Sequence, residues 1–219
     1  QVAATPEDVV GSDTDVLVVA DKPHDVADAL APVSTSLPSG CVVVSVAAGV
    51  TTASMEDALP VGQPVVRAMP NTPALVGAGI TAICAGQHTT DDNMDVAEEL
   101  LSALGAVVRV PETQMDAVAA VSGSGPAYVY LVAEAMIEGG VRVGLPRDLA
   151  TALTRATIAG AARLWEETGE HPGVLRERVT SPGGTTAAAL HALESGGLRA
   201  AFLDAVVANR DRSAELGGR

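Results

Sequence analysis

The sequence predicts an α/β fold in which a parallel sheet is followed by an all-helical segment. Short runs that are apolar at nearly every position, such as residues 16–20 and 41–46, are typical of strands covered on both faces. Helical spacing separates these runs, and strands that alternate with helices indicate a parallel sheet. After Glu112 no strand-like run occurs, so the second half of the chain is expected to be helical.

Strands and helices are expected to alternate up to residue 111. The expected strands cover residues 15–20, 41–46, 64–69, 79–85 and 107–110. Helical spacing occurs over residues 23–30 and 91–104, and in the second of these the apolar side chains share one face. Thr51 is expected to begin a further short helix.

The helical half is predicted to form a domain of its own. We place the boundary at Pro111, which divides the chain into residues 1–111 and 112–219. The sequence V-S-G-S-G-P at residues 121–126 predicts a helix start, with Ser124 or Gly125 at the N-cap. The helix that follows is apolar nearly all round, so we expect it to be buried on most sides and a partner subunit to cover part of this half. Further helices are expected at about residues 146–169, 173–179, 185–193 and 197–209.

Composition and charge exclude several classes of partner. The chain has 219 residues, of which 47% are apolar and 2% aromatic, so Ala, Val and Leu are expected to form the core. A net charge of −14 repels a phosphate backbone or an anionic membrane surface, so we expect no nucleic-acid partner. No apolar run reaches the length of a membrane span and no charged-then-apolar leader opens the chain, which favours a cytoplasmic protein with no membrane partner.

The cysteines and histidines predict neither a disulfide nor a metal site. Cys41 and Cys84 lie in strand-like apolar runs, so buried free thiols are expected. Two cysteines and four scattered histidines have no ligand spacing, which argues against structural zinc. No histidine has a paired carboxylate within sequence reach, so none is favoured as a catalytic acid.

The loops after the first three strands are expected to share one rim of the sheet, where open α/β sheets bind ligands. After the second strand, Ala47, Ala48 and Gly49 allow close approach to the backbone. Lys22 follows the first strand and either contacts a cofactor phosphate or ribose or is a solvated surface lysine; residue type alone favours the second. The run G-x-G-x-x-G that opens a dinucleotide fold is absent, so we expect either that the chain as given lacks its first strand–helix units or that the fold is a different one.

The stretch T-S-P-G-G-T-T at residues 180–186 is the strongest candidate for a binding site. Gly183 and Gly184 remove side chains where a helix is expected to begin, and the unpaired N–H groups there suit a carboxylate. The hydroxyl groups of Thr185 and Thr186 can donate to the same ligand. The alternative is an ordinary threonine N-cap, which spacing alone favours.

Two motifs resemble the signature stretches of the pyrroline-5-carboxylate reductase family. They are V-S-G-S-G-P-A-Y at residues 121–128 and T-S-P-G-G-T-T at residues 180–186, of which the second is highly specific. Shorter stretches resemble the family in the same order, at residues 22–23, 45–51, 67–73, 144–147, 169–173 and 194–197. The resemblance therefore covers nearly the whole chain.

This resemblance implies a Rossmann-like sheet domain, here without its first units, followed by an all-α dimerisation domain. It implies reduction of 1-pyrroline-5-carboxylate to L-proline, with NADPH or NADH as the hydride donor. It also implies a homodimer or a higher oligomer built from dimers. The family's active site lies between the cofactor loops of one subunit and the C-terminal helices of the dimer.

Carried over by position, the resemblance implies roles for two groups of residues. Thr186 would donate to the ring nitrogen of the substrate and is the catalytic candidate. The substrate-binding candidates are Glu112, Ser181, Gly183, Gly184, Thr185 and Thr186. The cofactor-binding candidates are Ala20, Asp21, Lys22, Pro23, Val46, Ala47 and Ala48, and no residue is assigned to a metal.

Besides the missing glycine run and second strand, without which the choice between NADPH and NADH cannot be read, two residues depart from the family, and two alternative functions stay open. Asp21 occupies a position that is usually apolar in the family, and Arg178 one where some members carry Asn; both bear on cofactor affinity more than on reaction type. A two-domain dehydrogenase acting on a β-hydroxyacid would require a lysine in the helical half, and none occurs after Glu112. The other alternative is a dimeric scaffold or regulator without enzymatic activity.

Overall fold

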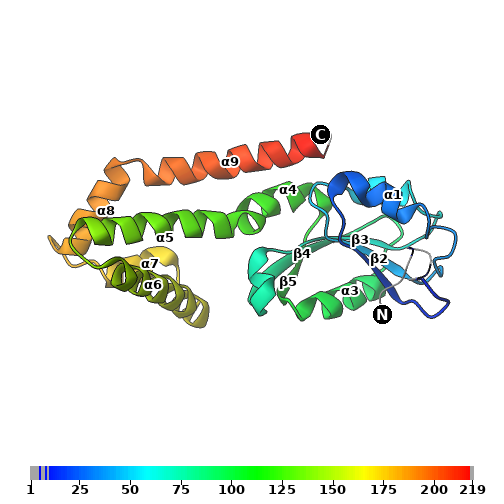
Figure 1. The fold of residues 1–219 in the computed structure, drawn as a ribbon, viewed down its shortest axis with the longest axis horizontal. Coiled ribbons are helices and arrows are strands. Elements are labelled where there is room, and N and C mark those ends of the chain that lie inside the picture. The colour runs from blue at the N-terminus through cyan, green and yellow to red at the C-terminus, as the bar shows by residue number, and fades with distance from the viewer. Residues whose placement is uncertain (1–4, 6–7, 9, 218–219) are drawn as a thin grey trace. The chain divides into compact units, whose positions relative to one another are not determined.

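The structure is a computed structural model that describes residues 5, 8 and 10–217, except for the side chain of residue 216 (Figure 1). The described residues form two compact units. The sheet unit extends to Pro126 and resumes at Val206, and the helical unit is Ala127–Ala205. The predicted domain boundary at Pro111 was based on where strand-like runs end, whereas these units are defined by their contacts. The boundary at Pro111 stays a prediction.

The sheet unit contains a five-stranded sheet in the order β1-β2-β3-β4-β5. Each predicted strand is confirmed with small changes of its ends. The strands are β1 (Val16–Val19), β2 (Val42–Ser45), β3 (Val65–Met69), β4 (Gly79–Ala85) and β5 (Gly105–Arg109). The pairs β1–β2, β2–β3 and β4–β5 are parallel, which confirms a mostly parallel, Rossmann-like sheet.

One strand pair differs from the expectation of a wholly parallel sheet. β3 and β4 are antiparallel, with Arg67 opposite Cys84. The short segment between them contains only the 3-10 helix η3 (Thr72–Val76). A parallel neighbour requires a longer crossover connection, so this short link reverses the chain direction.

Helices cover both faces of the sheet (Figure 1). One core cluster joins β1, β2 and β3 to α1 and α2 through Val43, Leu30 and Met55, which are fully buried. The other joins β2, β3 and β4 to α3 through Val44 and Ala97. The elements on these faces are η2 (Pro23–Asp25), α1 (Val26–Leu30), α2 (Thr52–Glu56) and α3 (Asp91–Ser102).

The chain leaves β5 through a helical stretch of mixed type. It comprises η4 (Glu112–Gln114), α4 (Met115–Val118) and the π-helical turn η5 (Ala119–Gly123), followed by α5 (Gly125–Arg142). The predicted helix start at residues 121–126 is therefore correct only for α5, which begins at Gly125 with Pro126 in its first turn. The preceding V-S-G is a wide π turn, in which the N–H of Ser124 donates to the carbonyl oxygen of Ala119, five residues earlier, at 2.9 Å.

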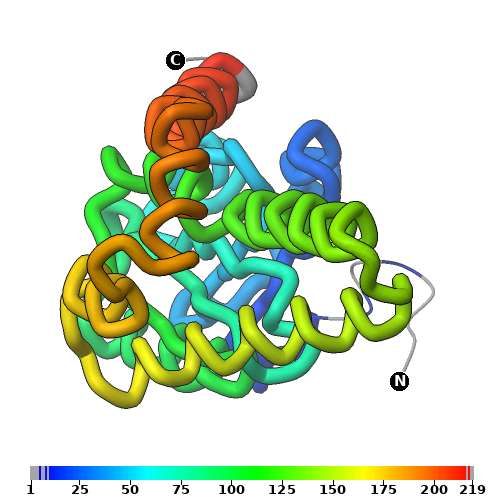
Figure 2. Tube along the Cα trace, turned by 90° about the vertical axis from the view of Figure 1, so that its left-hand side faces the viewer, coloured from blue at the N-terminus to red at the C-terminus, as the bar shows by residue number. Residues whose placement is uncertain are grey.

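The helical unit contains most of α5, followed by α6 (Arg147–Thr168), α7 (Pro172–Arg178), α8 (Thr185–Ser195) and the first turns of α9 (Leu198–Leu216), as Figures 1 and 2 show. These helices agree with the prediction, although α9 continues past Asn209, where its end was expected. Within the unit, Gly140 of α5 lies against Ala150 of α6. Tyr128 and Phe202 form an edge-to-face pair with ring centroids 6.4 Å apart.

The expectation that α5 is buried on most sides is wrong for a single copy of the chain. No residue of α5 is buried, and Tyr130 and Leu131 are 62% and 67% exposed. Other helices of the unit also expose large apolar side chains, among them Leu153 and Leu203. The apolar sequence of α5 thus marks a surface that requires a partner rather than an internal core.

Cys41 and Cys84 are free and buried, as predicted. Among the helices of residues 10–217, none is both long enough and apolar enough to traverse a lipid bilayer.

A close approach of two backbones fixes the start of β5, and we predict its sensitivity to a single methyl group. Gly105 has φ +132°, and a Cβ there would overlap the backbone of Gly79 on β4. Gly105→Ala is therefore expected to lower the free energy of unfolding by about 1–3 kcal/mol, measured by urea denaturation. Gly40→Ala is the control, because a Cβ at Gly40 meets nothing within 4 Å, and its effect is expected to stay within about 0.5 kcal/mol. Equal effects of the two substitutions would contradict this account of β5.

Candidate active site

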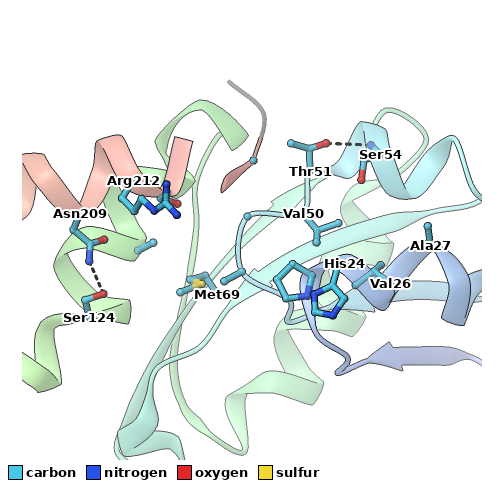
Figure 3. A pocket seen from close by; sticks show the side chains of 16 residues that line it. His24, Val26, Ala27, Val50, Thr51, Ser54, Met69, Ser124, Asn209 and Arg212 are labelled. Carbon is cyan, nitrogen blue, oxygen red and sulfur yellow. Dashed lines mark hydrogen bonds between the residues drawn. The ribbon is translucent and has the colours of Figure 1, made fainter. Parts of the chain in front are cut away.

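A cavity of about 660 Å³ opens in the sheet unit at the carboxyl ends of β1, β2 and β3 (Figure 3). This is the rim where open α/β sheets bind their ligands, and the volume lies in the range of cofactor and ligand sites. Pro23 and His24 follow β1, residues 48–51 follow β2, and Met69 ends β3. The predicted ligand rim thus coincides with this cavity at the first two loops, whereas residues 70–73 of the third loop are not among the lining residues.

The loop after β2, residues 47–51, forms one wall of the cavity. Gly49 has φ +81°, a conformation that other residues rarely adopt, so glycine is required there. The loop ends at Thr51, which is the N-cap of α2 as predicted, and its Oγ1 accepts a hydrogen bond from the N–H of Ser54 at 3.1 Å. Ala48 and Gly49 present little side-chain bulk, so a ligand can approach the backbone closely there.

The opposite wall comes from the π turn and from the second half of α9. The Nδ2 of Asn209 donates to the Oγ of Ser124 at 2.8 Å, and Arg212 and Ser213 line the cavity beside them (Figure 3). Sequence reasoning missed these three α9 residues because it ended the helix at Asn209. Their spacing of i, i+3 and i+4 places them on one helix face, and this spacing could have identified them as a shared polar surface.

Asn71 holds the turn between β3 and β4 against the π turn. Its Nδ2 donates to the carbonyl oxygen of Ser122 at 3.1 Å, and its Oδ1 accepts from the N–H of Ile80 at 3.0 Å. A Cβ at Gly123 would lie only 2.6 Å from the Met69 Cε, so glycine allows Met69 to lie beside the turn. The sequence P-N-T-P at residues 70–73 therefore supports the cavity wall through an asparagine side chain.

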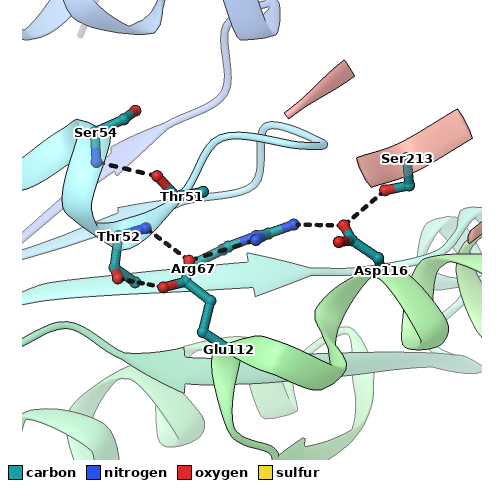
Figure 4. A network of polar contacts seen from close by, with 7 residues as sticks. All are labelled: Thr51, Thr52, Ser54, Arg67, Glu112, Asp116 and Ser213. Atoms are coloured by element: carbon teal, nitrogen blue, oxygen red, sulfur yellow. Dashed lines mark hydrogen bonds and ion pairs between the residues drawn. The ribbon is translucent and has the colours of Figure 1, made fainter. Parts of the chain in front are cut away.

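A polar network runs behind the cavity (Figure 4). The Glu112 Oε1 accepts from the backbone N–H of Thr52 at 2.8 Å, and its Oε2 accepts from the Thr52 hydroxyl at 2.7 Å. The Arg67 Nη1 lies 3.4 Å from the Glu112 Oε1, and its Nη2 lies 3.7 Å from the Asp116 Oδ1. Arg67 is only 2% exposed, so this guanidinium is a buried charge neutralised by two carboxylates. Asp116 in turn accepts from the hydroxyl of Ser213 at 2.9 Å.

The network shifts the pKa of two groups in opposite directions. Partial burial acts to raise the pKa of Glu112, but hydrogen bonds from Thr52 and Arg67 outweigh it and leave the pKa below its ordinary value. Burial raises the pKa of the Cys84 thiol to about 12, and the negative charge of Glu112 adds to this effect. Glu112 is therefore a carboxylate at neutral pH, and Cys84 is a neutral thiol.

The structure places the predicted cofactor residues at three kinds of position. Pro23 and Ala48 line the cavity. Ala20, Asp21 and Lys22 are exposed on the segment between β1 and η2. Val46 is half-buried, and Ala47 is buried with its N–H donating to the Ser45 Oγ at 3.2 Å. Contact of each of these residues with a cofactor stays a prediction.

The predicted substrate turn lies in the helical unit. Gly183 has φ +68°, and the N–H of Gly184 donates to the carbonyl oxygen of Ser181 at 3.0 Å. Gly184 is the N-cap of α8 and no side chain caps this helix, so the alternative of a threonine N-cap is not observed. Thr185 is exposed and Thr186 is half-buried at the first two helical positions, which leaves N–H groups of the first turn without helical acceptors.

One histidine caps a helix and another lines the cavity. His171 is the N-cap of α7, and its Nδ1 accepts from the N–H of Gly173 at 3.1 Å. His24 lines the cavity, a position that the sequence did not predict, and its Nε2 lies 3.5 Å from the Asp25 Oδ2. Across residues 10–217 together with 5 and 8, no group of three or more His, Cys, Asp or Glu is arranged to hold a metal ion.

Comparison with known proteins decides the family. A pyrroline-5-carboxylate reductase from Methanosarcina acetivorans is 44% identical over 98% of this chain and 79% of that protein. The chain belongs to the pyrroline-5-carboxylate reductase family. Residues 112–216 match the model of the dimerisation region of this family, "Pyrroline-5-carboxylate reductase dimerisation".

Solved structures of pyrroline-5-carboxylate reductases have the same fold. The chain is similar to the enzyme from Coxiella burnetii, with a TM-score of 0.88, 42% identity, and coverage of 93% of this chain and 76% of that one. It is also similar to the Plasmodium falciparum pyrroline carboxylate reductase determined with NADP bound, with a TM-score of 0.89, 30% identity, and coverage of 98% and 81%. The expected resemblance to pyrroline-5-carboxylate reductases and the fold class are therefore confirmed.

The lowered pKa of Glu112 predicts a pH-dependent contribution to stability. A carboxyl group with a lowered pKa in the folded state stabilises the fold fully above its unfolded value of about 4.5, and the contribution is lost as the pH falls through the folded value. Glu112→Gln is expected to lower the free energy of unfolding at pH 7 by about 1–3 kcal/mol, and this difference is expected to shrink below pH 4.5.

Denaturant unfolding at pH 7 and at pH 3–4 measures the difference, with the exposed Glu99→Gln as the control. A gap between wild type and Glu112→Gln that is the same at pH 7 and at pH 3–4 would contradict the assignment.

Proposed function

We propose that this chain reduces 1-pyrroline-5-carboxylate to L-proline with hydride from NADPH or NADH. The observation that carries the proposal is a T-S-P-G-G-T-T turn at the N-terminus of α8, which no side chain caps, in a family member that also has a cavity at the dinucleotide rim. The reaction is the last step of proline biosynthesis. The family and the fold support it together, because the fold alone serves many reactions.

The cavity of the sheet unit is proposed as part of the cofactor site. Its volume, its position at the strand ends and the small residues of the β2–α2 loop fit part of a dinucleotide. Pro23 and Ala48 would contact it there, with Ala20, Asp21, Lys22, Val46 and Ala47 as the further proposed contacts. When bound, the reduced nicotinamide supplies the hydride.

The turn before α8 is proposed as the substrate site. Backbone N–H groups around Gly183 and Thr185 would bind the carboxylate of the imino acid, because a helix N-terminus favours an anion. Gly184 and Ser181 would shape this turn, because the Gly184 N–H already donates to the Ser181 carbonyl oxygen. Thr186 would donate to the imine nitrogen. Hydride attack on C5 converts a planar C=N into an amine, and a donor at this nitrogen stabilises the charge that gathers there.

No strong side-chain acid is required for this reaction. A protonated iminium substrate is already electrophilic, so Thr186 acts as an orienting donor, and substrate protonation or water completes the proton balance. Glu112 was assigned to the substrate by resemblance, and this role stays a prediction. The alternative, a β-hydroxyacid dehydrogenase, would require a catalytic lysine in the helical half, and the sequence has no lysine after Glu112.

Three further properties belong to the proposal. The active molecule is a homodimer or a higher oligomer of dimers, supported by the match to a dimerisation region and by the exposed apolar surface of α5. The domain division is proposed at Pro111, which coincides with the start of the matched region at residue 112. The protein is proposed to act in the cytoplasm.

The proposed activity is tested by coenzyme oxidation with pyrroline-5-carboxylate, run on the protein from its full gene with both NADPH and NADH. We expect coenzyme oxidation that depends on the substrate, with proline as the product identified by chromatography. If the folded protein turns over with neither coenzyme, the proposal is wrong and the alternative of a dimeric scaffold or regulator is favoured.

The role of Thr186 is tested by Thr186→Ala. Because Gly184 and not a threonine is the N-cap, the melting temperature is expected to stay nearly unchanged, while kcat/KM falls about tenfold or more. Thr168→Ala, at the end of α6, is the matched control, and full activity is expected for it. A loss of about 1 kcal/mol of stability with turnover intact would instead make Thr186 a structural residue.

A further inference from the structure

The β2–α2 loop that lines the cavity is anchored at both ends by hydrogen bonds. At its start, the N–H of Val46 donates to the carbonyl oxygen of Val19 at 3.1 Å, and the N–H of Ala47 donates to the Ser45 Oγ. At its end, Thr52 is held by Glu112, sixty positions later in the sequence. Between these anchors, Ala47 and Val50 pack into the apolar core, while Ala48 and Gly49 face the cavity, so the hydrogen bonds at the two ends and this packing together set the position of the loop.

Glu112 binds Thr52 through both carboxylate oxygens. One oxygen accepts from the backbone N–H at 2.8 Å and the other from the hydroxyl at 2.7 Å. This two-point contact fixes the position and the orientation of the first residue of α2. Charge-assisted hydrogen bonds of this kind are stronger than those between neutral groups.

Arg67 connects this anchor to the opposite wall. Its guanidinium lies between Glu112 and Asp116, and Asp116 accepts from Ser213, which lines the cavity from α9 (Figure 4). Because Arg67 is 2% exposed and extends from β3 at the centre of the sheet, it is a fixed point for both carboxylates. Neither Arg67 nor Asp116 is among the residues that line the cavity.

We propose that Arg67 and Glu112 are positioning residues for the cofactor: through Thr52 on one side and through Asp116 and Ser213 on the other, they set the two walls of the cavity. This inference rests on the proposed function only in naming a dinucleotide as the cavity's ligand. It gives Glu112 a task different from the substrate contact that the family resemblance implies. Both of its oxygens are already engaged within the chain.

The two roles of Glu112 differ in which Michaelis constant they change. If Glu112 positions the cofactor loop, Glu112→Ala is expected to raise the KM for the coenzyme about tenfold and to change the KM for pyrroline-5-carboxylate by less than about twofold. Glu112→Gln can still accept from the Thr52 N–H, so an intermediate rise of about threefold is expected. Coenzyme affinity measured by isothermal titration is expected to follow the same order.

Thr52 provides the matched pair of variants. Thr52→Val removes the hydroxyl that Glu112 accepts from and is expected to raise the coenzyme KM about threefold, whereas Thr52→Ser retains it and is expected to behave as wild type. Glu112→Ala combined with Thr52→Val is expected to be no worse than Glu112→Ala alone, because both act through one contact. Thr90→Val is the structural control: it removes the capping box of α3, so it is expected to lower the melting temperature and leave the coenzyme KM unchanged.

The outcomes separate this inference from the proposed function. A rise of the substrate KM alone in Glu112→Ala would overturn the positioning role and support the substrate contact. Equal coenzyme affinity of wild type and Glu112→Ala, both folded by circular dichroism, would also overturn it. Absence of pyrroline-5-carboxylate reduction by wild type would overturn the proposed function, while titration with NADPH and NADH would still test the positioning role.

Discussion

The sheet unit depends on one buried guanidinium between two carboxylates. Arg67 cannot be removed from water without compensation, and Glu112 and Asp116 supply it. Each carboxylate also binds a hydroxyl group from a different element, Thr52 of α2 and Ser213 of α9. A single charge on β3 therefore brings together segments that lie far apart in the sequence, and the cavity lies between the elements so joined.

The helical unit follows a different physical principle. Its helices are rich in alanine and leucine and leave large apolar side chains exposed in one copy, including Leu131 and Trp165. Such a surface is stable in water only when it is covered. The match of residues 112–216 to a dimerisation region gives this surface a partner, a second copy of the chain. Hence a polar network joins distant segments of the sheet unit around its apolar clusters, whereas the helical unit covers its apolar surface by association.

Local patterns in the sequence predicted the elements better than they predicted the site. Continuous apolar runs located all five strands, and the glycine and proline turns located the helices of the second half. The reversal at β4 was missed because apolar runs carry no direction. The cavity wall from Asn209, Arg212 and Ser213 was missed because it depends on where a helix ends and on what lies opposite. The role of Glu112 at Thr52 could not be read either, since nothing local links residues sixty positions apart.

The buried thiols have a consequence for chemical durability. Oxidants and alkylating agents attack the thiolate, and a pKa of about 12 leaves Cys84 on the order of one part in 10⁵ ionised at neutral pH. Cys41 is also buried with a raised pKa, and the sequence contains no other sulfhydryl group. While the sheet unit stays folded, these two buried and mostly protonated thiols therefore react slowly with peroxide.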